Sequence, residues 1–133
     1  MNLEKDLLVK AKAVRLNAHT PYSGFKVGAV IRSGENFFVG ANVENASYGL
    51  SRCAEQSAVQ AMVSAGVTNF DEILVYTEAD TPASPCGSCR QILFEFAPDA
   101  KVTLVNHLGT VKKFTVKELL PEGFSFKVDT TDT

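Results

Sequence analysis

A run of four apolar residues, Ile73-Leu74-Val75-Tyr76, constrains the fold of this chain more than any other feature of its sequence. The run has the length of a strand, but it lacks the alternation of apolar and polar side chains that is typical of a strand with one face in water. A strand that is apolar on both faces needs a covering layer on each side. The run therefore predicts an interior strand of a sheet that lies between two layers of helices.

The rest of the sequence supplies the elements that such a fold requires. Apolar residues at three- and four-residue steps predict helices, and short apolar runs between turn residues predict strands. Helices are expected at 3–17, 53–65, 86–96 and 116–120, and strands at 25–31, 37–43, 101–105 and 111–115, with a frayed tail from Lys127. Their order predicts an α/β fold with three α/β/α layers around a five-stranded mixed sheet. The chain of 133 residues is expected to form a single domain, residues 1–133.

Composition excludes several classes of protein. Hydrophobic residues make up 45% of the chain and charged residues 21%, which is typical of a globular protein and not of a disordered one. A net charge of −2 gives no basic surface, so neither nucleic acid nor an anionic membrane is an expected partner. The apolar stretches are too short to span a membrane. The N-terminus carries the charged residues Glu4, Lys5 and Asp6, where a signal peptide would need a continuous apolar run. A reducing, cytoplasmic location is therefore expected, with free cysteines and no disulfide framework.

All three cysteines of the chain lie where helices are expected to begin. Cys86 and Cys89 are three residues apart, which places both thiols on one side of a first helical turn. Cys53 begins another helix, and one helix, one strand and a loop then return the chain to Cys86, so the two helix starts are expected to converge. Three thiolates predict a site for one Zn²⁺ per chain that keeps its fourth tetrahedral position open for water, as catalytic zinc does.

Glu55 is the predicted catalytic residue. It lies about 200° around a helix from Cys53, so it is expected not to bind the ion but to act on the bound water as a proton carrier. Three thiolates and one Zn²⁺ leave a net negative charge, which opposes ionisation of that water. The N-terminal dipoles of the two helices and the flanking residues Arg52 and Arg90 are predicted to offset this charge.

These motifs resemble those of a known family. Cys53-Ala54-Glu55 and Pro85-Cys86-Gly87-Ser88-Cys89-Arg90-Gln91 are similar to the zinc signature of the cytidine deaminases, in their small form with three cysteines. The resemblance covers nearly the whole chain, through 21–25, 40–48 and 119–121. It implies a cytidine deaminase-like fold and a homotetramer. It also implies hydrolytic deamination of cytidine and deoxycytidine to uridine and deoxyuridine with release of ammonia, in pyrimidine salvage, by a zinc-bound hydroxide and Glu55 as proton shuttle.

The resemblance also implies which residues bind the nucleoside. Asn42 and Glu44 are expected to hydrogen-bond the ribose hydroxyls, Phe25 to pack on the pyrimidine, and Ala54 to contact the substrate. An Asn and a Glu two positions apart on a strand face the same way, which agrees with a shared role. Without the resemblance, Asn42 and Glu44 would be ordinary polar residues of a hairpin.

Three further contacts are implied to come from neighbouring subunits. Ala46, Tyr48 and Phe124 are expected to complete the pocket of an adjoining copy, which predicts an obligate oligomer with shared active sites. Composition alone favours a core or interface role for such aromatic residues.

One position departs from the family pattern. The family often has an arginine directly after Cys-Ala-Glu, where it offsets the thiolate charge, whereas this chain has Gln56. Arg52, on the other side of Cys53, is the predicted replacement.

Other interpretations remain open at the level of sequence. A Cys-x-x-Cys pair at a strand-to-helix junction is also typical of thioredoxin-type redox proteins. A structural zinc site would need a fourth ligand, for which His19 and His107 are the available histidines. Among deaminases, an enzyme that acts on a modified cytosine nucleoside such as blasticidin S is the main alternative to a cytidine deaminase. An enzyme that edits nucleic acid would need a basic channel, which a net charge of −2 disfavours.

Overall fold

The computed structural model describes residues 3–126, which form ten helices and strands. In chain order these are α1 (Leu3–Arg15), β1 (Val27–Ser33), β2 (Asn36–Ala41), η1 (Tyr48–Leu50), α2 (Ala54–Ser64), β3 (Glu72–Thr77), α3 (Gly87–Phe96), β4 (Lys101–Asn106), β5 (Val111–Thr115) and α4 (Val116–Leu119). The expected frayed tail from Lys127 lies outside the described residues. No helix within residues 3–126 is long and apolar enough to cross a membrane.

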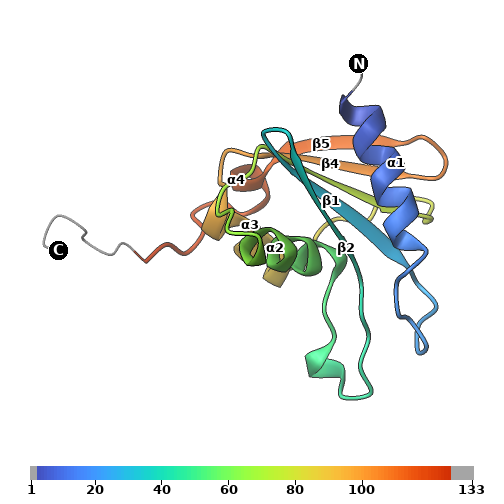
Figure 1. Ribbon diagram of the computed structural model, residues 1–133. Helices are drawn as coiled ribbons and strands as arrows, with labels where there is room; N and C mark the ends of the chain where they lie inside the picture. The colour runs from blue at the N-terminus through green and yellow to red at the C-terminus, as the bar shows by residue number, and fades with distance from the viewer. Residues whose placement is uncertain (1–2, 127–133) are drawn as a thin grey trace, which may run out of the picture.

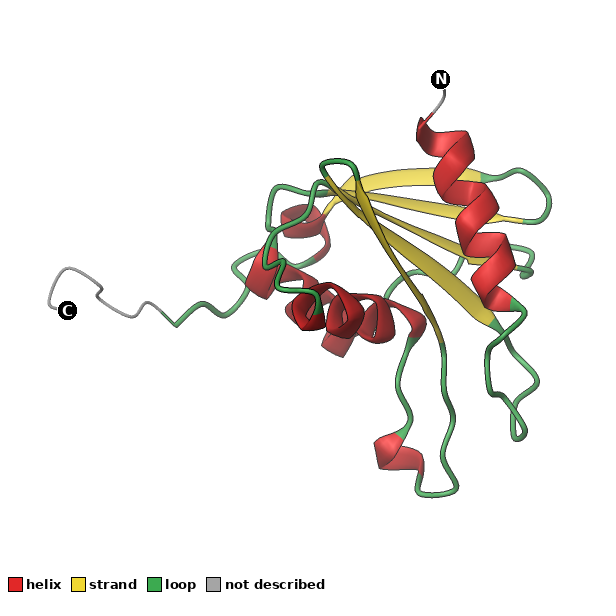
Figure 2. Ribbon diagram, viewed as in Figure 1, coloured by secondary structure: helices red, strands yellow, loops and turns green. Residues whose placement is uncertain are grey.

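The strands form one mixed sheet in the order β2-β1-β3-β4-β5. β3 pairs antiparallel with β1 and parallel with β4, while the two outer pairs are antiparallel. Figures 1 and 2 show α1 on one face of this sheet and α2, α3 and α4 on the other. The predicted three-layer α/β/α arrangement around a five-stranded mixed sheet is confirmed.

The apolar run that predicts an interior strand lies in β3, all of whose residues are buried. Ile73 and Val75 contact the core shared with α2, α3 and α4, whereas Leu74 and Tyr76 contact the smaller core beneath α1. Successive side chains of a strand point to opposite faces, so a strand between two helical layers must be apolar at every position. This is the physical reason that a run of four residues is informative about the whole fold.

Glycine at position 40 of β2 allows α2 to lie directly on the strand. A Cβ at Gly40 would come within 2.3 Å of the Ala58 nitrogen and 2.5 Å of the Ala54 carbonyl oxygen, which no side chain tolerates. The first turn of α2 is thereby fixed against the sheet. Because Cys53 immediately precedes this turn, the close approach also sets the position of that cysteine.

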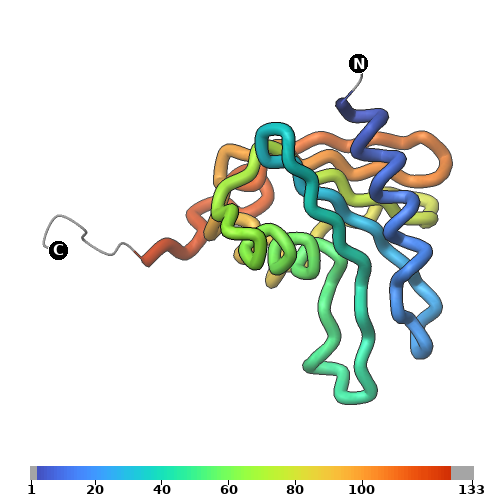
Figure 3. Tube along the Cα trace, viewed as in Figure 1, coloured from blue at the N-terminus to red at the C-terminus, as the bar shows by residue number. Residues whose placement is uncertain are grey.

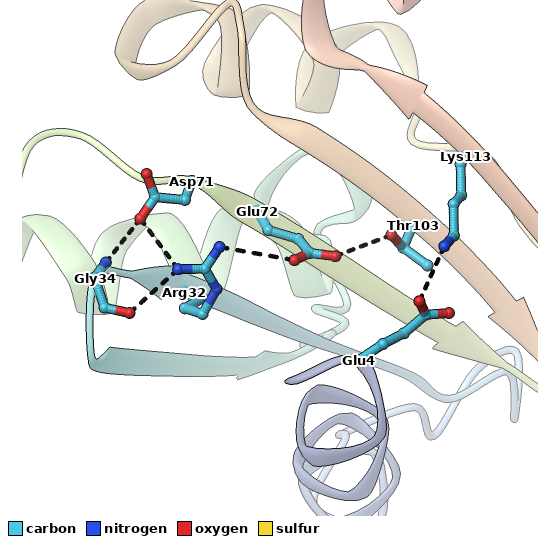
Figure 4. A network of polar contacts seen from close by, with 7 residues as sticks. All are labelled: Glu4, Arg32, Gly34, Asp71, Glu72, Thr103 and Lys113. Carbon is cyan, nitrogen blue, oxygen red and sulfur yellow. Dashed lines mark hydrogen bonds and ion pairs between the residues drawn. The ribbon is translucent and has the colours of Figure 1, made fainter. Parts of the chain in front are cut away.

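Ion pairs and hydrogen bonds form a network at the end of the sheet where β3 and β4 begin (Figure 4). It comprises Glu4, Arg32, Gly34, Asp71, Glu72, Thr103 and Lys113. Arg32 contacts Asp71 at 3.3 Å and Glu72 at 3.9 Å, and the Thr103 hydroxyl donates to Glu72 at 3.2 Å. These contacts connect the β1–β2 turn to β3 and β4.

Candidate active site

The three cysteines meet where α2 and α3 begin, as the spacing predicts. Cys53 and Cys86 are the N-caps of the two helices, and Cys89 lies in the first turn of α3. Each helix therefore starts one residue later than predicted, directly after the cysteine. The residue before a helix keeps an extended backbone, which lets its side chain cap the first turn. The Cys89 main-chain N–H donates to the Cys86 sulfur at 3.5 Å.

The geometry of the three sulfurs fits a tetrahedral zinc ion. The Sγ atoms of Cys53 and Cys86 are 3.8 Å apart, those of Cys86 and Cys89 are 3.3 Å apart, and all three lie within 4.8 Å of one another. Zn–S bonds of about 2.3 Å at tetrahedral angles require sulfurs about 3.8 Å apart. Neither His19 nor His107 belongs to this group, so the described residues offer three ligands and leave one position open.

The thiols differ in their surroundings. Cys89 is buried, Cys53 is partly buried and Cys86 is exposed, so the group opens on one side. A hydrogen bond with Cys89 is the main cause that lowers the pKa of the Cys53 thiol to about 6. The same bond and burial raise the pKa of Cys89. The dipoles of two helix N-termini favour negative charge at this place, which suits thiolate ligands.

Glu55 lies in the first turn of α2 and is 6% exposed. Burial is the main cause that raises the pKa of its carboxyl to about 7, and Cys53 and Cys89 are among the groups that influence this pKa. The acid therefore adjoins the cysteine group without being one of its three members. Its role as proton carrier stays a prediction, and its position is the one that such a role requires.

A short extended segment connects the cysteines to the predicted ribose-binding residues. Val43 exchanges two main-chain hydrogen bonds with Arg52, of 2.9 and 2.8 Å, and Glu44 donates its N–H to the His19 carbonyl at 2.8 Å. Asn42 and Glu44 flank Val43 in this segment. They therefore lie beside the residue that precedes Cys53, which brings the two motifs together across the gap in sequence.

The side chains of Asn42 and Glu44 both hold the loop that precedes β1. The Asn42 carboxamide accepts from the Val27 N–H at 2.9 Å and donates to the Phe25 carbonyl at 2.8 Å. The Glu44 carboxylate accepts the Ser23 hydroxyl and the main-chain N–H of Ser23 at 3.1 Å. The Ser23 bond holds the pKa of Glu44 below its usual value. Sequence reasoning did not anticipate that the predicted ribose ligands also brace this loop.

The aromatic side chains expected at the pocket are exposed. The exposed fractions are 42% for Phe25, 76% for Tyr48 and 70% for Phe124. Figure 3 shows the segment that carries Ala46 and Tyr48 extending beyond the sheet, while the segment that carries Phe124 leaves on the side of α3 and α4. Tyr48 contacts the Tyr22 ring at a centroid distance of 6.0 Å. We call Tyr48 and Phe124 the aromatic rim below.

Comparison with known proteins decides the family. Residues 1–105 match the family model described as the cytidine and deoxycytidylate deaminase zinc-binding region. The chain belongs to this family. The resemblance drawn from the sequence motifs is confirmed, and so are the zinc-dependent deaminase class and the zinc-binding role of the Cys53, Cys86 and Cys89 group.

Relatives of the same family align with most of the chain. A cytidine deaminase of Halalkalibacterium halodurans is 41% identical over 126 residues, which are 92% of this chain and 96% of that protein. The crystal structure of a cytidine deaminase from Burkholderia pseudomallei superimposes with a TM-score of 0.89 at 42% identity, covering 93% of this chain and 100% of that one. A blasticidin-S deaminase of Bacillus cereus is 36% identical over 104 residues, which are 71% of this chain and 74% of that protein.

Gln56 is the site residue that sequence reasoning missed as a contact. Its side chain is buried, accepts the Cys53 N–H at 3.3 Å and donates to the Cys89 sulfur at 3.8 Å. A neutral amide thus occupies the position at which the deaminase family often has an arginine. The available signal was the capping pattern, in which a Gln three residues after an N-cap folds back onto the N-cap main chain.

The two arginines proposed for charge tuning lie differently. Arg52 donates to the carbonyls of Gly49 and Ser51, and its charge is the smallest of the influences that lower the Cys53 pKa. The Arg90 guanidinium donates hydrogen bonds to the Pro85 carbonyl at 2.9 Å, the Ser84 hydroxyl at 2.8 Å and the Leu119 carbonyl at 2.9 Å. Charge tuning stays a prediction for both residues, and the visible role of Arg90 is to brace the loop before Cys86.

Proposed function

We propose that the chain catalyses hydrolytic deamination of cytidine and deoxycytidine to uridine and deoxyuridine, with release of ammonia, as a step of pyrimidine salvage. The observation that carries the proposal is a buried carboxyl beside an open group of three thiols. The family relationship supports the substrate class. The opening at Cys86 supports access by a small molecule.

The mechanism assigns distinct tasks to the residues of the site. Cys53, Cys86 and Cys89 would hold Zn²⁺, which, when bound, supplies Lewis-acid activation of water near neutral pH. Glu55 accepts a proton from the attacking water and delivers it to N3 of the cytosine. It then takes the remaining proton from the hydroxyl added at C4 and passes it to the amino group. The C4–N bond then breaks, ammonia leaves, and the carbonyl of uridine forms.

Nucleoside binding is assigned to the segment beside the cysteines. Glu44 and Asn42 accept and donate hydrogen bonds at the ribose, and Phe25, whose ring is partly exposed, packs on the base. Ala54 offers its main-chain N–H, which has no partner within the helix because it lies in the first turn of α2. These are the contacts that one chain is proposed to offer the nucleoside.

The aromatic rim supports the proposal of a homotetramer with shared sites. Tyr48 and Phe124 are large apolar side chains that lie exposed on segments projecting from the fold, as residues of an interface do. We propose that Ala46, Tyr48 and Phe124 complete the pocket of an adjoining copy. Sedimentation of the purified protein should then give a tetramer, and turnover per chain should fall on dilution below its dissociation constant.

The test of the function is a steady-state assay of the zinc-loaded protein with cytidine and with deoxycytidine. Loss of the cytosine absorbance and release of ammonia should occur in equal amounts. Glu55→Gln serves as the matched control, because it keeps the size of the side chain and removes the ionisable proton. Zinc-loaded wild-type protein that leaves both nucleosides unchanged would refute the proposal.

A blasticidin-type nucleoside is the second candidate substrate, since a blasticidin-S deaminase is among the relatives of the chain. The same assay decides between the two. A kcat/KM for blasticidin S above that for cytidine would make the modified nucleoside the substrate. The Glu44 carboxylate argues for a free ribose, because a carboxylate can accept hydrogen bonds from both hydroxyls of a diol.

A further inference from the structure

The chain beyond the end of α4 forms no helix or strand up to residue 126. The last residue of α4 and this following segment are nevertheless held against α3 at three points. α3 is the helix that begins at Cys86 and carries Cys89. The segment that presents Phe124 is therefore attached to the same helix that presents two of the three zinc ligands.

Two of the contacts set the path of the segment. Nη1 of Arg90 donates to the Leu119 carbonyl at 2.9 Å. Gly123 lies against the ring of Phe94, where a Cβ would come within 2.9 Å of two ring carbons, so the main chain passes directly over the ring. Neither contact reaches the residue that follows Gly123.

Gln91 makes the third contact, and it holds Phe124 itself. Its Nε2 donates to the Phe124 carbonyl at 2.9 Å, and its Oε1 accepts the Phe124 N–H at 3.2 Å. Two bonds to the main chain of one residue restrain the direction in which its side chain leaves. The Phe124 ring is 70% exposed, so packing within its own chain does little to fix it. Gln91 thus restrains the main chain from which the ring extends.

We propose that Gln91 is a positioning residue for nucleoside binding, whose carboxamide holds Phe124 so that the ring completes the pocket of an adjoining copy of the chain. The inference rests on the proposed function, in which the aromatic rim reaches a neighbouring site. A ring that is restrained before the nucleoside arrives loses less conformational freedom on binding, which strengthens binding and leaves the chemical step unaffected. Gln91 therefore acts in one subunit on the affinity of another.

The first test separates positioning from a general loss of structure. Gln91→Met keeps the length of the side chain and removes both hydrogen bonds, so KM for cytidine should rise about tenfold while kcat stays within about twofold. Gln60→Met, at an exposed glutamine of α2, is the matched control and should leave both constants unchanged. In a cycle with Phe124→Leu, the effects on KM should not add, because Gln91 acts through Phe124. Additive effects, or an unchanged KM in Gln91→Met, would overturn the inference.

The second test asks whether the effect acts between subunits. Gln91→Met chains are co-expressed with an excess of Glu55→Gln chains, and hybrids are purified through two tags. Only the Gln91→Met chains then have working sites, and most of their neighbours offer a correctly held Phe124. KM should return toward the wild-type value. A KM that stays as high as in the pure Gln91→Met oligomer would overturn the inference, because the defect would then lie within the subunit's own site.

Failure of the inference and failure of the proposed function give different results. A wild-type oligomer that deaminates cytidine, together with a Gln91→Met variant of unchanged KM, refutes only the role of Gln91. A wild-type protein that is inactive on cytidine, or fully active as a monomer, refutes the proposed function or its shared sites. Far-ultraviolet circular dichroism of each variant verifies that the fold is retained.

Discussion

The cysteine group is partly enclosed by its own chain, with Cys89 buried and Cys86 exposed, whereas the aromatic rim is exposed throughout. The cysteine group is assembled by two helix starts of one chain, with the buried side chains of Glu55 and Gln56 beside it. The rim consists of exposed residues on segments that leave the fold. Under the proposed function, a single chain assembles the catalytic residues but needs a neighbouring copy to complete nucleoside recognition. Variants of the two regions should therefore fail in different ways.

The largest effect is expected from Glu55→Gln. The amide cannot carry the proton, so kcat should fall by about 10²–10⁴ or more, since proton transfer alone contributes that much. Zinc content, measured by atomic absorption, should stay at one ion per chain because Glu55 is not one of the three thiol ligands. If the variant keeps the wild-type kcat, Glu55 does not carry the proton, and the contrast between a catalytic region and a binding region fails.

The next largest effect is expected from Tyr48→Ala in the rim. Tyr48 is exposed and is proposed to contact a neighbouring subunit, so loss of its ring should raise KM for cytidine about tenfold and weaken the oligomer, while the zinc content stays unchanged. Steady-state kinetics and analytical ultracentrifugation measure the two results. If Tyr48→Ala lost zinc but kept its KM, the rim and the cysteine group would not be separate regions.

A smaller effect is expected from Gln56→Leu beside the cysteines. The change removes the donor to the Cys89 sulfur and the acceptor for the Cys53 N–H, so zinc should dissociate about two- to tenfold faster. Transfer of zinc to a chromogenic chelator measures the rate. Exposed Gln60→Leu, one turn further along α2, is the control and should dissociate at the wild-type rate.

The smallest effect on activity is expected from Glu72→Gln in the network of Figure 4. The variant keeps an acceptor for Thr103 but loses the attraction to Arg32, so the free energy of unfolding should fall by about 1–2 kcal/mol. Urea unfolding measures this change. Both kcat and KM should equal those of the wild type, because the network lies at the end of the sheet where β3 and β4 begin. A changed KM would show that this end communicates with the site.

Sequence patterns sufficed wherever one local rule decided the structure. The four apolar residues of β3 determine the layers because each must be covered, and the Cys-x-x-Cys spacing determines that two thiols share a helical turn. The predicted position of Glu55 follows from the separate Cys53-Ala54-Glu55 motif. The strand starts were less certain: β1 begins at Val27 and not at Phe25, because the Phe25 carbonyl is taken by the side chain of Asn42.

Contacts between segments that are distant in the sequence could not be predicted from such local patterns. The hydrogen bonds between Gln91 and Phe124 join residues 33 positions apart, and the hydrogen bonds from Ser23 to Glu44 join two loops. No periodicity records such pairs, since each depends on the path of a whole segment in space. Gln56 is intermediate, because its capping pattern was visible but its donation to the Cys89 sulfur depends on where α3 begins.

The close packing at Gly40 has a consequence for how this molecule tolerates change. Position 40 carries no functional group and lies on a strand, but any larger residue there would push the start of α2 outward and carry Cys53 and Glu55 with it. In a saturation mutagenesis library selected for growth on cytidine as pyrimidine source, this position should accept as few alternatives as the cysteines themselves. A residue can thus be indispensable to catalysis by virtue of having no side chain.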